Sequence, residues 1–288
     1  MPIIHSGSSQ PVTFKYIANI PLWQSEKPYV IDQIPDIPEG SLSNLIYEDH
    51  ESHSLHNLRG YEEGVNTFDN SFQFIKHPTK LTALAEEEMM VPYAEEINDL
   101  LKTIFKTDHV ITYDLRSKAG KKGIAQTEQE VHPSRKLFKE PQGCISYCLN
   151  YHSRDGGWDR VARHLTDEEL AKFKSGKWRA RIVNVWRPLI PIVEDNPIAF
   201  LDPATVHDED LVEVDRVSPI SCGRMYNIKF NPAQKWYWIN NQSSEEIAVF
   251  VCFDSHPPDG RFNYPGARSD APIRQSVETR TIVFTLLP

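Results

Sequence analysis

The sequence has few cysteines, and their spacing does not predict a metal site. Four cysteines occur in 288 residues, without a C-x2-C motif. Cys144 and Cys148 are separated by three residues, and no histidine lies nearby at zinc-finger spacing. Cysteine is among the most buried residue types, so we expect Cys144, Cys148, Cys222 and Cys252 to be free thiols in the interior.

Long apolar runs are also absent. No stretch approaches the roughly 18 consecutive apolar residues that predict a transmembrane helix. The first residues, MPIIHSGSSQPVTF, have neither the basic segment nor the apolar core of a secretory signal peptide. We therefore expect a cytoplasmic protein that does not associate with a membrane.

Positive charge is scarce and scattered. The formal net charge is -9 at pH 7, from 31 Lys and Arg against 40 Asp and Glu. A nucleic-acid surface requires clustered Lys and Arg that neutralise phosphates. This composition argues against a nucleic-acid partner and favours a small-molecule metabolite as partner, with a homodimer left open.

The length suits a single all-β domain with additions, so we expect one domain over residues 1–288. Residues 1–78 are rich in turn-forming residues and predict an irregular N-terminal layer. Residues 79–108 are rich in helix-forming residues and predict helices that pack on the body of the protein. Pro92 should start a second helix there, because proline is not tolerated well inside a helix.

The chain after residue 108 predicts mostly β-structure. Thr166 as N-cap and Glu169 three residues later form a capping box, which predicts a short helix over 165–176. The other segments are β-branched or aromatic and are separated by turn residues, as in an antiparallel jelly roll over 109–288. The expected strands cover 109–117, 179–187, 198–202, 225–232, 234–240, 245–254 and 279–287.

A candidate anion site precedes the last expected strand. Arg274 and Ser276 form an R-x-S triplet, and Arg280 follows at the start of the strand. The donor fork of arginine suits a carboxylate, and a hydroxyl two residues later lies on the same side of an extended chain. The alternative is that these arginines lie on the surface.

Several blocks of the sequence, in order, resemble one known family. They are NVWRPL (184–189), DPATVHDEDLVEVDR (202–216), MYNIKFNPAQKWYW (225–238), EEIAVFVCFDS (245–255) and APIRQSVETRTIVF (271–284). From about Phe72 to Phe284 the chain resembles the fungal AsaB-like hydroxylase/desaturase family of the iron(II)/2-oxoglutarate oxygenase superfamily. The resemblance implies a mainly β fold, a double-stranded β-helix (jelly roll) with a few flanking helices. It also implies fungal secondary metabolites as substrates, and an R-x-S element, here Arg274 and Ser276, that binds the far carboxylate of 2-oxoglutarate.

The iron ligands of that family, a His-x-Asp and a distal His, do not match this sequence in the expected register. Counting back from the glycine pair at 156–157 places the first two ligands on Leu149 and Tyr151, and the distal His falls on Pro265. Leu and Pro offer no side-chain ligand, so we expect no metal and no cofactor. Iron(II) with 2-oxoglutarate is the alternative if the register is displaced, with His132, His152 and His256 as substitute ligands.

A jelly roll without iron still offers a concave pocket for a small molecule. Tyr151 would take the metal position, or simply fill its space. A general acid in such a pocket can protonate or orient a carbonyl. The catalytic candidates are Tyr151, His152, Asp155 and His256. The substrate-binding candidates, each with a structural alternative, are Asn184, Trp186, Arg187, Tyr226, Trp238, Arg274, Ser276 and Arg280.

Three functional hypotheses follow from these residues. The first is a metal-independent isomerase, cyclase, dehydratase or pericyclase of fungal secondary metabolism, whose activity survives chelators. The second is an active iron(II)/2-oxoglutarate-dependent hydroxylase or desaturase, which forms succinate. The third is a non-catalytic partner of an active homologue.

Overall fold

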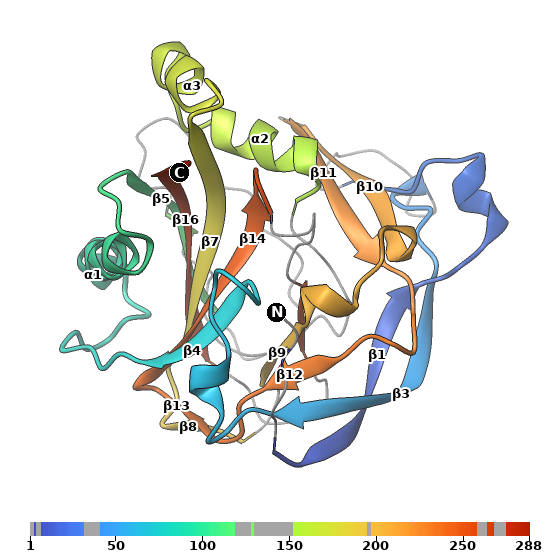
Figure 1. Ribbon diagram of the computed structural model, residues 1–288, viewed down its shortest axis with the longest axis horizontal. Coiled ribbons are helices and arrows are strands. Elements are labelled where there is room, and N and C mark those ends of the chain that lie inside the picture. Colours follow the sequence, from blue (N-terminus) through green and yellow to red (C-terminus); the bar gives the residue numbers. More distant parts are fainter. Residues whose placement is uncertain are drawn as a thin grey trace.

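Two β-sheets face each other, with helices outside them (Figure 1). The computed structural model describes residues 3, 7–31, 41–118, 128–129, 152–194, 197–219, 221–257, 264–267 and 275–288. The sheets form a jelly roll, so the predicted mainly β fold is confirmed. Within the described residues, no helix is long and apolar enough to cross a membrane.

The larger sheet has six strands in the order β4-β14-β7-β16-β5-β6, and all neighbours are antiparallel. β16 lies between β7 and β5, which places the last strand of the chain at the centre of the sheet. The strands are β4 (Phe72–Lys76), β5 (Val110–Lys118), β6 (Glu128–Gln129), β7 (Trp178–Pro188), β14 (Glu246–Asp254) and β16 (Ser276–Leu286). Four of them overlap segments that the sequence predicted as strands: β5, β7, β14 and β16.

The facing sheet has five strands in the order β1-β3-β12-β9-β15. They are β1 (Ser9–Ile17), β3 (Tyr47–Asn57), β9 (Ile198–Leu201), β12 (Trp236–Trp238) and β15 (Tyr264–Ala267). Smaller sheets contain β2 (Tyr29–Ile31), β10 (Leu211–Ser218) and β11 (Ser221–Ile228), and β8 (Ile192–Val193) with β13 (Gln242–Ser243). Single 3-10 turns cover Pro21–Gln24, Glu62–Gly64, Pro203–Thr205 and Asp208–Asp210.

The six-stranded sheet is buried on both faces, because successive side chains of a strand point to opposite sides. On β7, Ile182 and Trp186 belong to the core between the two sheets. Val183 and Val185 belong to a second core, on the side of α1 (Glu87–Phe105). Inward-facing positions of β7, β14 and β16 therefore line the interior of the jelly roll.

One helix covers the outer face of this sheet, where the sequence predicted a helix break at Pro92. Pro92 lies inside α1, close to its N-terminus, and the helix continues through it to Phe105. The buried positions recur at three- and four-residue spacing, as expected for a helix with one apolar face. They are Met90, Tyr93, Ala94, Ile97, Leu101 and Phe105. Burial of this face outweighs the hydrogen bond that proline cannot donate.

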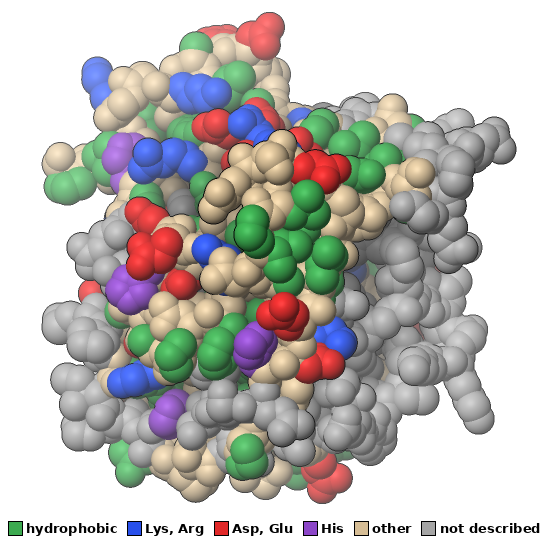
Figure 2. Space-filling model, turned by 90° about the vertical axis from the view of Figure 1, so that its right-hand side faces the viewer, with side chains coloured by type: hydrophobic (Ala, Val, Ile, Leu, Met, Phe, Trp, Pro, Cys, Tyr) green, Lys and Arg blue, Asp and Glu red, His purple; other side chains and the backbone are tan. Residues whose placement is uncertain are grey.

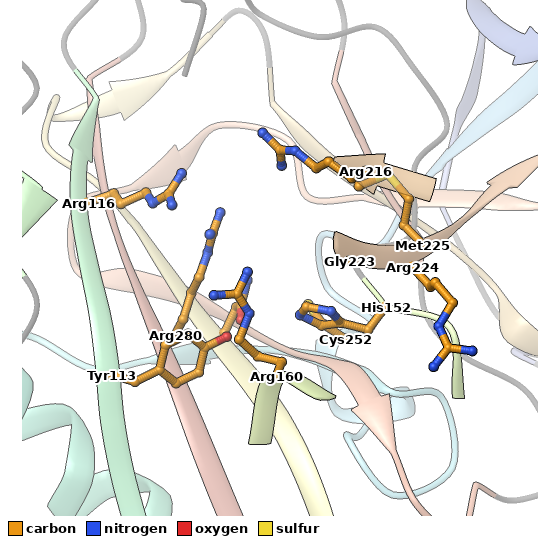
Figure 3. A pocket seen from close by; sticks show the side chains of 11 residues that line it. Tyr113, Arg116, His152, Arg160, Arg216, Gly223, Arg224, Met225, Cys252 and Arg280 are labelled. Carbon is orange, nitrogen blue, oxygen red and sulfur yellow. The ribbon is translucent and has the colours of Figure 1, made fainter. Parts of the chain in front are cut away.

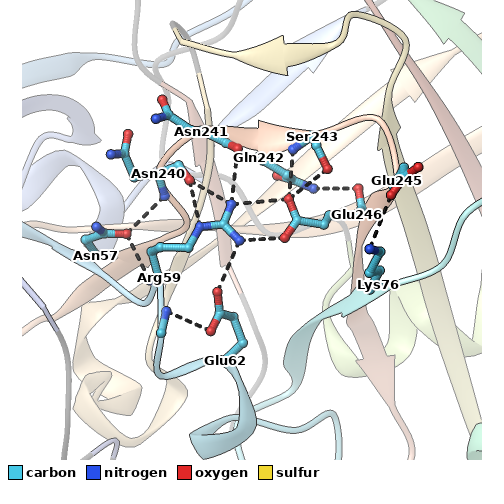
Figure 4. Close-up of polar contacts among 11 residues, drawn as sticks. Asn57, Arg59, Glu62, Lys76, Asn240, Asn241, Gln242, Ser243, Glu245 and Glu246 are labelled. Carbon is cyan, nitrogen blue, oxygen red and sulfur yellow. Dashed lines mark hydrogen bonds and ion pairs between the residues drawn. The ribbon is translucent and has the colours of Figure 1, made fainter.

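The first 78 residues are more regular than expected, because β1 and β3 form a long antiparallel pair of the five-stranded sheet. The chain after β3 is attached to the body by Arg59 (Figure 4). Its guanidinium donates to Glu246 Oε2 at 3.2 Å, to the carbonyl of Asn240 at 2.8 Å and to Glu62 Oε1 at 3.2 Å. Glu246 also accepts hydrogen bonds from Ser243. This network joins the N-terminal segment to the start of β14.

Two short helices follow residue 152: α2 (Arg154–Ala162) and α3 (Asp167–Phe173). The predicted capping box of α3 is confirmed, with Thr166 and Glu169 bonded reciprocally. α2 was not predicted. An added Cβ at Gly157 would overlap the ring of Phe253, and one at Gly156 would overlap the carbonyl oxygen of Arg224. The glycine pair therefore lets α2 pack directly on β14 and β11.

The surface of the described residues carries both signs of charge. Figure 2 shows acidic and basic side chains intermingled on one face, with apolar side chains between them. The absence of a nucleic-acid partner stays a prediction.

Replacement of Gly157 by alanine should destabilise the protein by about 1 to 3 kcal/mol, because the methyl group overlaps the buried Phe253 ring. Denaturant unfolding measures the change. Gly64→Ala is the control, since an added Cβ there has no neighbour within 4 Å. Equal stability of the two variants would contradict the close packing of α2.

Glu246→Gln should reduce the free energy of unfolding at pH 7 by about 1 to 3 kcal/mol, the range for hydrogen bonds to charged groups. Burial raises the pKa of Glu246, but hydrogen bonds from Arg59 and Ser243 outweigh it, and the pKa is lowered overall. A lowered folded-state pKa stabilises above the ordinary glutamate pKa and is lost as the pH falls through the folded value.

The difference between wild type and Glu246→Gln should therefore shrink in thermal melts below about pH 4.3, the ordinary glutamate pKa. Glu245→Gln is the neighbouring control, because Glu245 is exposed and its carboxylate lies 3.4 Å from the exposed Lys76. A difference that does not depend on pH would rule out the ionised Glu246 as its source.

Candidate functional site

A cavity of about 60 Å³ opens inside the jelly roll. Its described lining includes five arginines and neither Asp nor Glu. The lining residues are Tyr113, Arg116, His152, Arg160, Asn184, Arg216, Gly223, Arg224, Met225, Cys252 and Arg280. Figure 3 shows the side chains of Arg116, Arg160, Arg216 and Arg280 converging, while Arg224 points away from them. The protein is acidic overall, yet it has a local cluster of positive charge in its interior.

The lining comes from both sides of the fold. Asn184, Cys252 and Arg280 are inward-facing residues of β7, β14 and β16, at the centre of the six-stranded sheet. Arg160 comes from α2, and His152 lies directly before its N-cap, Ser153. The packing of α2 on the sheet therefore positions two of the polar groups of the cavity.

Two buried carboxylates behind the lining hold Arg280. Its Nη1 lies 3.2 Å from Asp114 Oδ2, and its Nε lies 3.5 Å from Glu278 Oε1. Asp114 also pairs with Arg116 at 2.8 Å, and Asn184 donates to Glu278 at 2.7 Å. Asp114, Glu278, Asn184 and Arg280 are each at least nine-tenths buried. These contacts fix the orientation of the Arg280 guanidinium.

Burial controls protonation in the cavity. Desolvation, followed by the nearby Arg160 and Arg280, holds the pKa of His152 well below its ordinary value, so its imidazole is neutral at pH 7. Burial raises the pKa of Tyr113 to about 12, so its hydroxyl keeps its proton. Burial also raises the pKa of the Cys252 thiol. At neutral pH the cavity therefore offers cations and neutral polar groups.

We tested whether these residues fit iron and 2-oxoglutarate, the groups that the sequence resemblance implies. The described residues contain no group of three His, Cys, Asp or Glu side chains placed to hold a metal ion. His152 is the one histidine of the described lining, so this part of the chain does not complete an iron site. The arginines fit the dianion 2-oxoglutarate, because guanidinium groups bind carboxylates through paired hydrogen bonds.

The structure brings three of the predicted site residues together: His152, Asn184 and Arg280. Asp155 is exposed on α2 and pairs with Arg224 at 2.8 Å, and His256 is exposed beside Ser255. Arg187 lies on the outer face of β7, where it donates to Tyr93 of α1 at 3.0 Å. These three residues are not among those that line the cavity.

The remaining candidates are not part of the described lining, or they lie outside the described residues. Trp186, Tyr226 and Trp238 belong to or pack against the core between the sheets, outside the described lining. Ser276 is buried at the start of β16, and its partner in the predicted clamp, Arg274, lies outside the described residues. Leu149 and Tyr151 also lie outside them, and Pro265 is on β15. The clamp and the register of the metal positions stay predictions.

Sequence reasoning missed Tyr113, Arg116, Arg160 and Arg216. Tyr113 and Arg116 lie in a segment predicted as a strand, but regular alternation places residues three apart on opposite faces. A register shift at Tyr113, between the partners of Arg280 and Thr281, brings both side chains to the cavity, and the sequence does not show this irregularity. Arg160 and Arg216 come from α2 and β10, and no local pattern shows that these elements approach the sheet.

Solved structures of similar fold cover nearly the whole chain. A variant of the iron and alpha-ketoglutarate-dependent endoperoxidase NvfI superimposes with a TM-score of 0.78 over 99% of this chain and 100% of that chain, at 20% identity. At that identity the likeness shows the jelly-roll fold alone.

Curated relatives are fungal. "Hydroxylase/desaturase efuI" of Hormonema carpetanum is 24% identical over 80% of this chain and 82% of its own length. "Alpha-ketoglutarate-dependent dioxygenase phiK" of Fungal sp. (strain ATCC 74256) is 28% identical over 75% of this chain and 78% of its own length.

These comparisons overturn the expectation that the protein uses no cofactor. By its name phiK depends on alpha-ketoglutarate, and "Fe(II)/2-oxoglutarate-dependent dioxygenase nvfI" of Aspergillus novofumigatus (strain IBT 16806), 28% identical over 67% of this chain and 66% of its own length, depends on both iron(II) and 2-oxoglutarate. The expectation rested on counting residues back from the glycine pair. A displacement by one residue exchanges the two faces of a strand, so such a count is a weak basis for excluding ligands.

One family matches almost the whole chain, residues 14–284, under the description "Oxidoreductase/YMDC permease-like domain". The match covers the described strands of both facing sheets, apart from the start of β1 and the end of β16, and the residues that line the cavity. The relatives agree with the family that the sequence blocks indicated. The chain belongs to this oxidoreductase family, alongside the fungal iron(II)/2-oxoglutarate-dependent hydroxylases and desaturases.

Proposed function

We propose that the protein is an iron(II)/2-oxoglutarate-dependent oxygenase, a hydroxylase or desaturase, that acts on a small metabolite of fungal secondary metabolism. The arginine-lined cavity inside the jelly roll is the observation that carries this proposal. Its guanidinium groups suit the carboxylates of 2-oxoglutarate. The names of the relatives support both the co-substrate and the oxidative class of reaction.

The buried contacts of Arg280 support a binding role for the cavity. Asp114 and Glu278 hold the guanidinium in one orientation before any ligand enters. Side chains locked by a second layer of hydrogen bonds bind ligands without a large loss of conformational entropy. Neutral His152 and protonated Tyr113 add polar groups without adding negative charge that would repel a carboxylate.

The redox-neutral enzyme and the non-catalytic partner that the sequence also suggested receive no support from these relatives. The relatives' names describe hydroxylation, desaturation and dioxygenation. The redox-neutral reading depended on a site without cofactors, which the comparisons contradict.

Anaerobic addition of iron(II) and 2-oxoglutarate to the chelator-stripped protein should produce the weak visible charge-transfer band of the ternary complex. Admission of oxygen together with ascorbate should then convert 2-oxoglutarate to succinate and CO2, with the succinate measured by chromatography. Ascorbate supplies the two electrons that reduce the second oxygen atom to water while no substrate is present. The same protein kept in EDTA is the control and should form none. Absence of both the band and succinate would refute the proposed function.

Arg280→Met should destabilise the fold by about 3 to 5 kcal/mol, because it removes the cation beside buried Glu278 and one of the two arginines that pair with buried Asp114. The double variant Arg280→Met/Glu278→Gln should recover part of this loss, since it removes one uncompensated charge. Denaturant unfolding of both variants and of Glu278→Gln completes the cycle. Additive losses would show that the two side chains do not interact.

A further inference from the structure

Three arginines of the described lining pair with described carboxylates, and Arg160 does not. Arg116 and Arg280 share Asp114, and Arg224 pairs with Asp155 at 2.8 Å and with Asp159 at 3.0 Å. Arg160 has no carboxylate within ion-pair distance among the described residues. Its guanidinium lies over the ring of Tyr113, whose centroid is 6.0 Å from the Arg160 Cζ.

The carboxylates nearest to Arg160 pair with other arginines. Arg116, Arg160 and Arg280 converge on one side of the cavity (Figure 3). Asp114 and Glu278 lie within ion-pair distance of Arg116 or Arg280, and neither pairs with Arg160. Burial lowers the pKa of Arg160, and Arg280 and Arg116 lower it further, against the opposite effects of Tyr113 and Asp114. A partly buried cation without a paired carboxylate is costly, and an anionic ligand would offset that cost.

Two neutral groups of the lining add hydrogen-bonding capacity. Asn184 is 1% exposed; its nitrogen donates to Glu278, and its Oδ1 has no hydrogen-bond partner among the described residues. Buried polar atoms are almost always hydrogen-bonded, so this acceptor indicates a ligand group or a water molecule that donates to it. Tyr113 keeps its proton, and its ring lies against Arg160.

We propose that Arg160 is the counter-charge of a carboxylate that binds in this cavity. A volume of about 60 Å³ is far below the roughly 300 Å³ of a complete small-molecule site, so the described part of the cavity holds one end of a ligand. The carboxylate comes from 2-oxoglutarate or from the metabolite. The choice between these two sources rests on the proposed function. The observation that Arg160 has no paired carboxylate among the described residues does not.

The predicted R-x-S clamp makes the distinction between the two sources important. Ser276 and Arg280 lie four residues apart on β16, which is roughly 13 Å along a strand. If the clamp holds the far carboxylate of 2-oxoglutarate, a carboxylate on Arg160 is either the other carboxylate of 2-oxoglutarate or one that the metabolite carries. In the second case the substrate is an acidic compound.

Isothermal titration of wild type, Arg160→Gln and Arg160→Lys tests the proposal. The probes are 2-oxoglutarate and benzoate, a simple monocarboxylate, each added anaerobically with iron(II) present. Loss of a charged hydrogen-bonded pair costs about 2 kcal/mol or more, so Arg160→Gln should weaken binding by about 30-fold. Arg160→Lys should lose less, because it keeps the charge but not the donor fork. Arg154→Gln is the matched control, since it removes an exposed arginine from the same helix.

The two probes separate the sources of the carboxylate. Weaker binding of 2-oxoglutarate assigns Arg160 to the co-substrate. If wild type binds both probes at the same time and the variant binds only benzoate more weakly, the carboxylate on Arg160 belongs to the metabolite. The proposal is overturned if Arg160→Gln binds every probe with the same affinity as wild type. It is also overturned if wild type binds neither probe. Should Arg160→Gln not fold, the comparison of Arg160→Lys with wild type decides in the same way.

This outcome is independent of the proposed function. Absence of both the charge-transfer band and succinate in wild type would refute the oxygenase. The benzoate titration would still measure whether Arg160 binds a carboxylate.

Discussion

The interior of this jelly roll depends on keeping Arg280 charged and oriented inside a low-dielectric core. An isolated buried guanidinium would cost several kcal/mol, and Asp114 and Glu278 offset this cost by pairing with it. Asn184 then holds Glu278. The cavity thus lies beside a buried ion network, whose arginines reach the described lining while Asp114 and Glu278 lie behind it.

The six-stranded sheet makes this arrangement possible because its two faces contact different parts of the protein. The outer face packs against α1 through an apolar cluster that includes Val183 and Val185. The inner face carries Asn184 and Arg280 among large core residues such as Trp186. A polar network can therefore replace apolar packing on one face while the other face still holds the sheet to its helix.

The strands of the sheet could be predicted because β-branched and aromatic residues recur between turn residues, and Arg280 was a candidate because it belongs to one of them. α2 was missed because Gly156 and Gly157 lower helix propensity, although packing against β11 and β14 requires them. β3 was missed because its sequence, YEDHESHSLHN, is polar. Arg160 could not be predicted, since its role depends on how closely α2 approaches the sheet. Iron(II) and 2-oxoglutarate were only the alternative expectation, because a residue count cannot resolve a displacement by one position.

The alternation of β7 and β16 also limits how the length of this chain can vary. An insertion of one residue within either strand would exchange its two faces, placing valines in the cavity and Asn184 or Arg280 against α1. In β16 the buried pair of Arg280 with Asp114 would be lost, and in β7 the hydrogen bond from Asn184 to Glu278. Changes in length are therefore expected between the strands and not within them, and divergence in ligand preference should proceed through the connecting segments while β7 and β16 keep their length.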